Sequence, residues 1–388
     1  MKLKKKINVH IYPSDMQNEA RIQKISSSID QLEYFDHIYQ LGINKNSLLP
    51  EFEKVNKNIT IVRLPVDSQK WADKRFFGKI LPIFKFWILS YKFLKNKKPK
   101  IINAHNLASL PPCIFFKILN KKSKVVYDTH ELETEREGSG NLEKCVTKIF
   151  EYIFIRFVDE VVVVNHIIGD WYKKKYSVSP IVINNVPNYR HRKTSNYLSN
   201  KFDIKADIKK FIYIGALLSD RGIQKYLELF RKTDLNICII FLGSGPLQEL
   251  IKSHEKKNKN IFFHPAVPYK DVVNIVSSGD FTVTTLRTKN KYSLSYESAL
   301  PNKLFESIMS EIPILSGGMK HEADFIRKNK IGYEITSSNS QKEFELSVKS
   351  ILNLDYNNMQ KNCRTLAKDY NWEEQEMKIK KYMIALLN

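Results

Sequence analysis

The chain has 388 residues, of which 43% are hydrophobic and 27% are charged, and its formal net charge is +22 at pH 7. This length and apolar content exclude an intrinsically disordered protein and are sufficient for two domains, each with its own core. The positive charge favours an anionic partner, either nucleic acid, a membrane surface or a polyanionic substrate, and a Lys/Asn/Ile-rich composition of the kind an AT-rich genome encodes accounts for part of it.

The first apolar run covers residues 7–12 and directly follows a lysine-rich start. No small-residue cleavage pattern follows this run, so we interpret it as a buried strand and not as a signal peptide. No uncharged apolar run reaches the roughly 20 residues that cross a bilayer. The four cysteines lie far apart in apolar or helical contexts, which indicates reduced core residues of a cytoplasmic protein and neither disulfides nor a metal site.

Short β-branched runs alternate with longer amphipathic segments, a pattern typical of βαβ units with parallel sheets. The strands expected in the first half cover residues 7–12, 37–41, 59–64, 101–104, 124–128, 160–165 and 181–184. Ligands of open parallel sheets bind outside the carboxyl ends of the strands. We therefore place the catalytic candidates His105, Asp128 and His130 on a functional rim, where Asp128 either orients His130 or caps a turn. His10, inside the first strand, is expected in the core.

Residues 74–100 contain nine basic side chains and no acidic one, interleaved with many aromatic and aliphatic residues. A basic rim around interfacial aromatics is how a helix that lies in the plane of a membrane is built. An ordinary amphipathic helix with a solvated basic face fits the same pattern. The sequence leaves both interpretations open.

The hydrophobic pattern lapses over residues 191–209, which we interpret as a linker between two Rossmann-like domains of residues 1–190 and 210–370. Further strands are expected at residues 211–214, 237–242, 261–264, 281–285 and 312–316. Residues 371–388 are predicted to form a final helix that crosses back to pack on the N-terminal domain. Two such domains leave a cleft between them, a common place for ligands that bridge domains.

Two glycine turns in the second half favour a nucleotide diphosphate. Gly215 follows a strand and precedes a helical run, so backbone N–H groups and the positive end of a helix dipole lie close to an anion there. Arg221, in the same turn, offers a bidentate phosphate contact. Gly243 and Gly245 form a second strand-to-helix turn, but this turn lacks the acidic residue at the end of the next strand that NAD binding would need.

Two later segments add to this pattern. Residues 264–269, which include Val267, end another strand and can present backbone groups and an aromatic wall to a base, although a plain turn is the simpler interpretation. Pro301 is suited to start a helix, which leaves the amide of Asn302 and those after it free at a positive terminus. Glu306 shares a face of this helix with Asn302 and Lys303 and is suited to accept hydrogen bonds from a ribose diol.

In this order and spacing, the motifs resemble those of the GT-B glycosyltransferases of the retaining group 1 (family 4) type. The segments that carry the resemblance in the second half are Ile-Gly-Ala-Leu…Arg-Gly, Gly-Ser-Gly-Pro and Pro-Asn-Lys-Leu-Phe-Glu…Ile-Pro-Ile. In the first half, residues 101–105 resemble the family's His-Ala-His strand end, and residues 126–132 resemble its Tyr-Asp-x-His-Glu segment. The resemblance covers nearly the whole chain and implies an acceptor-binding N-terminal domain and a donor-binding C-terminal domain.

The resemblance also implies roles for individual residues. Gly215 and Arg221 would meet the donor diphosphate, the amides around Leu300–Lys303 would hold phosphate, and Glu306 would bind the ribose. His105 would lie near the reacting sugar and the acceptor. The first carboxylate of the family's Glu-x7-Glu pair, which contacts the donor sugar, falls at Ser298 in this chain, so the identity of the sugar stays open.

No Asp-x-Asp pair, of the kind that holds a divalent ion on a diphosphate, occurs at these motifs. We therefore expect no metal and no cofactor, with positive side chains and helix dipoles taking over the neutralisation of the diphosphate. The sequence predicts a glycosyltransferase that uses a nucleoside diphosphate sugar, with UDP favoured over GDP. A lipid-linked or surface-glycan acceptor at the inner face of an anionic membrane is expected. The alternatives are another GT-B nucleotide-sugar enzyme, such as an epimerase, and a basic nucleic-acid-binding protein, which the lack of nucleic-acid-binding motifs disfavours.

Overall fold

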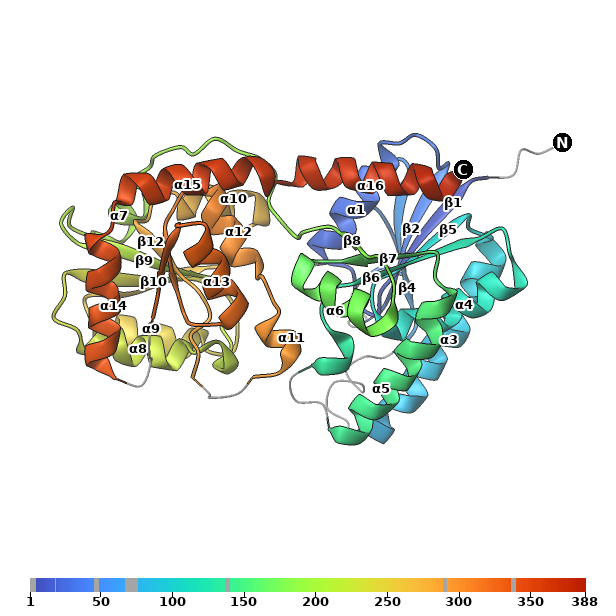
Figure 1. The fold of residues 1–388 in the computed structure, drawn as a ribbon, viewed down its shortest axis with the longest axis horizontal. Helices are drawn as coiled ribbons and strands as arrows, with labels where there is room; N and C mark the ends of the chain where they lie inside the picture. The colour runs from blue at the N-terminus through green and yellow to red at the C-terminus, as the bar shows by residue number, and fades with distance from the viewer. Residues whose placement is uncertain are drawn as a thin grey trace. The chain divides into compact units, whose positions relative to one another are not determined.

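The computed structural model describes residues 5–17, 19–44, 49–66, 76–136, 140–288, 292–335 and 340–388, with the backbone alone for residues 76–80. The chain divides into two compact α/β units (Figure 1). Unit 1 comprises residues Met1–Asn185 and Gln375–Asn388, and unit 2 comprises Val186–Glu374. Each unit is built around its own sheet, which is the two-domain arrangement expected from the sequence.

The sheet of unit 1 has eight strands in the order β3-β4-β2-β1-β5-β6-β7-β8. All neighbours pair in parallel except β3 with β4. The strands are β1 (Ile7–Ile11), β2 (His37–Ile43), β3 (Phe52–Lys54), β4 (Ile59–Leu64), β5 (Ile101–Ala104), β6 (Lys124–Thr129), β7 (Glu160–Val163) and β8 (Ile181–Val182). The strand order reverses between β1 and β5, and the carboxyl ends of these two strands therefore mark the position where open sheets bind ligands.

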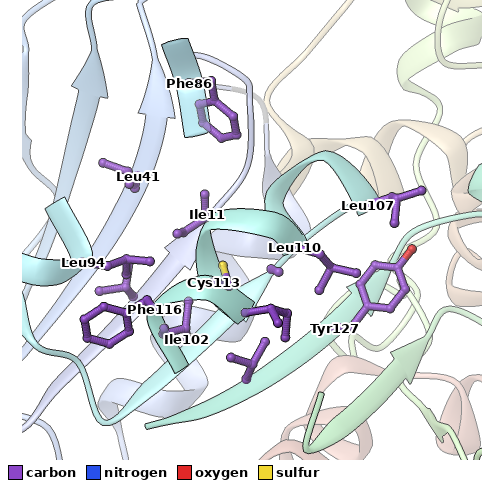
Figure 2. Close-up of a cluster of buried hydrophobic side chains, with 14 of the residues drawn as sticks. Ile11, Leu41, Phe86, Leu94, Ile102, Leu107, Leu110, Cys113, Phe116 and Tyr127 are labelled. Carbon is purple, nitrogen blue, oxygen red and sulfur yellow. The ribbon is translucent and has the colours of Figure 1, made fainter. Parts of the chain in front are cut away.

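The helices of unit 1 cover both faces of this sheet. They are α1 (Ala20–Asp30), α3 (Phe76–Lys97), α4 (Leu110–Leu119), α5 (Asn141–Phe154), α6 (His166–Tyr176) and most of α16 (Trp372–Leu387), with short 3₁₀ turns η1 (Leu107–Ser109), η2 (Glu133–Glu135) and η3 (Ile155–Phe157). Figure 2 shows the core beneath α3 and α4, where Phe86 and Leu94 of α3 and Phe116 of α4 pack with Ile11 and Ile102 of the sheet.

Unit 2 has a six-stranded, all-parallel sheet in the order β11-β10-β9-β12-β13-β14. The strands are β9 (Lys209–Ile214), β10 (Ile237–Gly243), β11 (Ile261–Pro265), β12 (Phe281–Val283), β13 (Ile314–Ser316) and β14 (Gly332–Glu334). The helices are α7 (Tyr197–Phe202), α8 (Ile223–Lys232), α9 (Gln248–Glu255), α10 (Tyr269–Val276), α11 (Leu294–Glu297), α12 (Asn302–Met309), α13 (Lys320–Lys328), α14 (Gln341–Asn353) and α15 (Tyr356–Asp369), with the 3₁₀ turn η4 (Ser219–Arg221). Here the order reverses between β9 and β12, so ligands are expected near the end of β9.

The segment interpreted as a linker differs in the structure. Residues 191–209 belong to unit 2, and α7 lies within them. Leu198 and Ile204 of this segment are buried in a cluster with Ile240 of the sheet. The polar composition of the segment hid these two anchoring apolar residues, which have no regular period.

The C-terminal helix α16 contributes its last residues to unit 1. Ile379, Tyr382 and Met383 are buried there, and the backbone N–H of Asn184 donates a hydrogen bond to Gln375 Oε1 at 3.0 Å. Unit 1 is thus made of two separate stretches of chain, and unit 2 of one. Among the described residues, no helix combines the length and the apolar content that crossing a bilayer requires.

Candidate active site

A cavity opens at the carboxyl end of the sheet in unit 2. It has a volume of about 320 Å³. Its lining residues are Tyr213, Ile214, Gly215, Ala216, Arg221, Leu242, Ala266, Val267, Val272, Pro301, Asn302, Lys303 and Glu306. Six residues predicted from the sequence are therefore brought together, and they come from three different segments. Gly243, Gly245, Ser298 and Leu300 are not part of the lining.

The glycines explain how the backbone forms this cavity. Gly215, directly after β9, has a φ of 111°, a conformation that favours glycine. A Cβ on Gly243 would lie 1.9 Å from the carbonyl oxygen of Gly215, and one on Gly245 would lie 2.6 Å from the carbonyl oxygen of Leu217. Gly243 and Gly245 thus allow the second turn to pack against the first. The two glycines therefore support the shape of the cavity, and their contact with the ligand stays a prediction.

Helix α12 points its N-terminus at the cavity, with Pro301 as the residue that caps it. The first amides of a helix lack intrahelical partners, and the helix dipole makes this end positive, so it is suited to bind phosphate. Glu306 lies one turn further along α12 and is only 7% exposed. Its negative charge contributes to a raised pKa of Tyr269, after burial, which places the carboxylate beside that side chain.

Lys303 supplies a cation to the cavity from the same helix. Its ammonium lies 3.9 Å from the centroid of the Tyr213 ring. Burial lowers the pKa of Lys303, and the buried carboxylate of Glu322 opposes this shift. Burial in turn raises the pKa of Glu322, and Lys303 opposes that shift. A bound anion would favour the charged form of Lys303, because it adds a negative charge beside the ammonium.

Arg221 is the second cation and is held by aromatic rings. Its guanidinium carbon lies 5.0 Å from the centroid of the Tyr296 ring, and Tyr296 stacks on Tyr292 with centroids 5.1 Å apart. The Tyr296 hydroxyl donates to the carbonyl oxygen of Asp220 at 3.2 Å. Arg221 Nε also lies 3.7 Å from Asp220 Oδ2. A guanidinium over an aromatic face gains cation–π attraction, and its planar fork can still present N–H groups to an anion. Neither tyrosine was predicted, because no local motif marks them.

Ser298 is buried and lies outside the cavity lining. The neighbouring Glu297 forms an ion pair with Arg287 at 2.9 Å and accepts a hydrogen bond from the backbone N–H of Lys320 at 3.1 Å. The carboxylate of Glu297 is therefore occupied. Neither residue places a negative charge at the cavity of unit 2.

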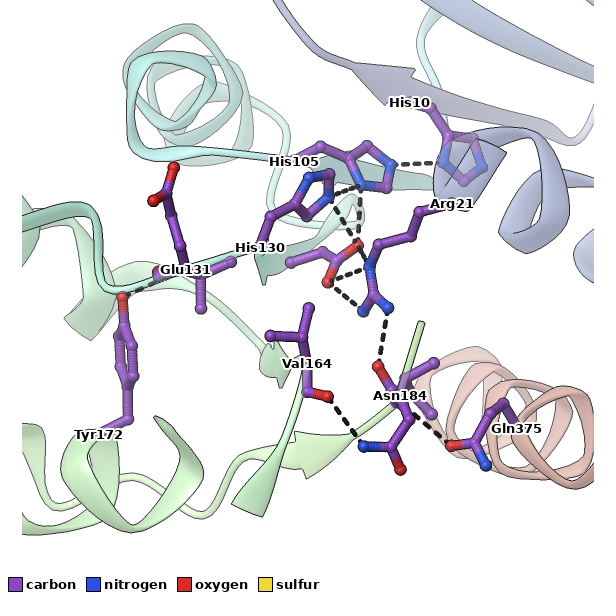
Figure 3. Close-up of polar contacts among 12 residues, drawn as sticks. His10, Arg21, His105, His130, Glu131, Val164, Tyr172, Asn184 and Gln375 are labelled. Atoms are coloured by element: carbon purple, nitrogen blue, oxygen red, sulfur yellow. Dashed lines mark hydrogen bonds and ion pairs between the residues drawn. The ribbon is translucent and has the colours of Figure 1, made fainter. Parts of the chain in front are cut away.

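A second group of polar residues lies at the strand ends of unit 1 (Figure 3). His105 follows β5, and Asp128 lies near the end of the neighbouring strand β6, with His130 just after it. His105 Nδ1 lies 2.9 Å from Asp128 Oδ2, and His130 Nε2 lies 3.4 Å from the same oxygen. The three predicted catalytic candidates therefore meet on one rim, as the strand order requires.

His105 is fully buried, and both of its ring nitrogens are engaged. Nδ1 faces Asp128, and Nε2 lies 2.8 Å from Nδ1 of His10, whose ring stacks on that of His105. Burial lowers the pKa of His105 to about 4, against the opposing effect of Asp128. Both ring nitrogens of His105 thus have protein partners, and its place near the reacting sugar stays a prediction. His130, whose side chain is 22% exposed, is the histidine of this cluster that reaches the surface.

Asp128 is anchored from the opposite side by Arg21 of α1, a residue that the sequence did not single out as part of the site. Arg21 Nη2 lies 2.7 Å and Nε 3.0 Å from the two carboxylate oxygens, and Nη1 donates to the carbonyl oxygen of Ile183 at 2.7 Å. Burial alone would raise the pKa of Asp128, but Arg21 and the two histidines outweigh it and hold this pKa well below its usual range. Asp128 is therefore a fixed negative charge that orients both histidines.

His105, Asp128 and His130 offer ligand atoms within 4.8 Å of one another, a spacing that a metal ion could bridge. However, the Arg21 guanidinium already takes both oxygens of Asp128 and neutralises its charge. A divalent cation would have to displace Arg21 or lie beside its positive charge. The donor set therefore fits an ion-paired cluster better than a metal centre.

We compared the chain with known protein families and solved structures. Residues 196–370 match the family model described as "Glycosyl transferases group 1". Among solved structures, the chain is similar to a sucrose-phosphate synthase from Thermosynechococcus elongatus, with a TM-score of 0.76 at 11% sequence identity, over 98% of this chain and 99% of that one. A glycosyltransferase from Rickettsia africae gives a TM-score of 0.69 at 14% identity over the full length of both chains.

A third similar structure is Anabaena HepE in complex with UDP-glucose, with a TM-score of 0.70 at 12% identity, over 98% of this chain and 99% of that one. A search of curated protein sequences finds no match. At these identities, the structural matches show the fold, and the family model identifies the domain that holds the cavity. The chain therefore has the GT-B fold, and its residues 196–370 match the group 1 glycosyl transferases.

Proposed function

We propose that this enzyme transfers a sugar from a UDP-sugar to a lipid-linked or surface-glycan acceptor, with retention of configuration at the anomeric carbon. The observation that carries the donor half of this proposal is the cavity of unit 2. It unites two cations, a helix N-terminus and a buried carboxylate. The complexes of HepE with UDP and with UDP-glucose, on the same fold, support UDP as the nucleotide.

The proposed roles follow from where charge develops during transfer. As the bond between the sugar and the diphosphate breaks, negative charge grows on the departing phosphate oxygen. Preorganised positive groups stabilise this charge most effectively in a site with little water. Arg221, Lys303 and the amides at the start of α12 supply such groups, and Glu306 accepts hydrogen bonds from the ribose hydroxyls.

We further propose that the reaction needs neither a metal ion nor a cofactor. The two cationic side chains and the helix dipole supply the positive charge that a divalent ion otherwise provides to a diphosphate. In unit 1, His130 would face the acceptor, with Asp128 and Arg21 holding it in place. The acceptor would be presented at the cytoplasmic face of a membrane, with the exposed basic side chains Lys85, Lys92 and Lys95 of α3 near its anionic lipids. Lys74 and the side chain of Lys79, which belong to the same predicted segment, lie outside the described residues.

Thermal unfolding with a panel of nucleotides tests the donor. A ligand that binds the native state raises apparent stability by mass action. UDP and UDP-sugars should raise the melting temperature more than GDP or ATP do, and EDTA should leave both the shift and turnover unchanged. Loss of the shift in EDTA would refute the metal-free mechanism. Consumption of the UDP-sugar without any acceptor, yielding an isomeric UDP-sugar, would instead identify an epimerase.

A further inference from the structure

Exposed apolar side chains are unevenly distributed over the described residues. Eleven of the twenty large hydrophobic side chains that are exposed lie on α3, α4, α5 and η3 of unit 1. They are Leu81, Phe84, Ile88, Phe115, Ile118, Leu119, Leu142, Ile149, Tyr152, Ile153 and Phe157. Leu81 is 80% exposed and Leu119 is 70% exposed. Monomeric soluble proteins rarely expose large apolar side chains in a contiguous group.

On each helix these residues form an outward stripe, separate from the residues in the core. In α3, Phe86 and Leu94 face the core, while Leu81, Phe84 and Ile88 recur at helical spacing on the outside. The outward residues of α4 are Phe115, Ile118 and Leu119, and those of α5 are Leu142, Ile149, Tyr152 and Ile153. Each helix is therefore apolar on two faces, and the outer face leaves these side chains largely exposed among the described residues.

The three helices lie together on one side of the sheet (Figure 1), and a chain of ring contacts connects them. Phe84 contacts Trp87 within α3, Trp87 contacts Phe150 of α5, Phe150 contacts Phe154, and Phe154 contacts Phe115 of α4, with centroids 5.1 to 6.3 Å apart. Phe84 and Phe115, which lie at the two ends of this series of ring contacts, are about half exposed. The stripes are thus parts of one surface, which we call the α3–α5 surface.

Basic residues continue each stripe towards the end of its helix. The outer face of α3 changes from Leu81, Phe84 and Ile88 to Lys92 and Lys95. The outer face of α4 is followed by the exposed pair Lys121 and Lys122, and that of α5 by Arg156. None of these five basic side chains forms an ion pair with another described residue. The surface therefore has an apolar centre with an unneutralised basic margin.

We propose that the α3–α5 surface is a membrane-docking site whose occupant is a bilayer rich in anionic lipid. The apolar side chains enter the boundary between headgroups and acyl chains, and the basic margin contacts the phosphates. A second copy of the chain would bring two positive margins together, so charge complementarity favours lipid. This inference rests on the proposed function, which makes the acceptor lipid-linked or part of a surface glycan. It places most of the membrane contact on α4 and α5, which the sequence did not indicate.

Vesicle flotation tests the proposal with the full chain. Wild-type protein should float with vesicles of phosphatidylglycerol and phosphatidylcholine at low salt, and much less with phosphatidylcholine alone. The variant Phe115→Ser/Ile118→Ser/Leu119→Ser removes only outward residues of α4, and its partition coefficient should fall by about tenfold or more, since three large apolar side chains leave the interface. The matched control Leu250→Ser/Leu346→Ser/Leu354→Ser removes three exposed leucines of unit 2 and should float like wild type.

A thermal shift with UDP, recorded for every variant, separates loss of docking from loss of the fold or of the donor site. Failure of wild type to float, or equal flotation of the α4 variant, overturns the docking proposal even where UDP binds. A dimer in solution that the α4 variant converts to a monomer also overturns it, because the occupant is then a second copy. Flotation without any effect of UDP on stability would leave the docking surface intact and refute the proposed donor.

Discussion

At the scale of single residues, the cavity of unit 2, which we propose binds the donor, depends on a few side chains that neighbouring groups hold in place. Arg221 rests on Tyr296, Lys303 on Tyr213, and Glu306 is almost enclosed. Such preorganised groups need little rearrangement when a diphosphate arrives. Substitutions at these positions should therefore affect affinity more than stability.

Glu306→Gln should weaken UDP binding by about tenfold, because a hydrogen bond to a charged acceptor contributes roughly 1.5–3 kcal/mol. The fold should survive, since the amide keeps the size of the carboxylate. Titration calorimetry measures the affinity, and Glu249→Gln on the exposed face of α9 is the control. An unchanged UDP affinity would remove Glu306 from the site.

Arg221→Ala should weaken UDP by about tenfold or more and uridine hardly at all, because only UDP carries the charge that a guanidinium binds. Tyr296→Leu should cause a smaller loss in the same direction, since it removes the ring that holds Arg221 in place. Competition assays with both ligands give the comparison. Equal losses for uridine and UDP would place Arg221 at the nucleoside.

At the scale of elements, the ends of β1, β5 and β6 hold the cluster around Asp128. His10 and His105 both have pKa values lowered chiefly by burial, to about 4 for His105. A histidine of the unfolded chain takes up a proton below about pH 6.5, whereas the folded protein leaves both rings neutral there. The two buried histidines therefore make their full contribution to the free energy of unfolding above about pH 6.5, and this contribution is lost as the pH falls towards about 4.

The lowered pKa of His105 alone should reduce the free energy of unfolding by about 3 kcal/mol between neutral pH and the acid end of this range. Thermal unfolding measured from pH 7.5 to pH 4.5 should show this loss. His10→Asn removes one of the two titrating rings and should flatten the decline, whereas His191→Asn, at an exposed position, should not. A variant curve parallel to that of wild type would exclude His10 as a source of the acid sensitivity.

The elements also show what sequence can and cannot predict. Every predicted strand is present, because β-branched runs between helical segments are a strong local pattern. The short strands β3 and β14 were missed, since three residues with exposed or half-exposed side chains carry no such pattern. Of the sites, Gly215, Asn302 and Glu306 belong to local motifs, whereas Arg21 meets Asp128 across 107 positions of chain. Only the fold brings such pairs together.

At the scale of the whole molecule, each unit has its own core, and α16 completes that of unit 1. Ile379→Ala should destabilise unit 1 by about 2–5 kcal/mol, the usual cost of truncating a fully buried isoleucine. Met377→Ala, on the exposed side of the same helix, should cost little. Calorimetry with and without UDP should show the destabilised transition to be the one that UDP does not shift. A uniform shift of both transitions would mean that the units unfold as one.

The division of unit 1 into two stretches of chain has a consequence for synthesis. On a ribosome, the whole of unit 2 emerges before the last residues of unit 1, because Gln375–Asn388 follow it in the chain. Unit 2 can therefore fold while unit 1 still lacks Ile379, Tyr382 and Met383. Until these side chains have been synthesised, the part of unit 1 that they cover is a hydrophobic surface open to chaperones, so unit 2 completes its core before unit 1 does.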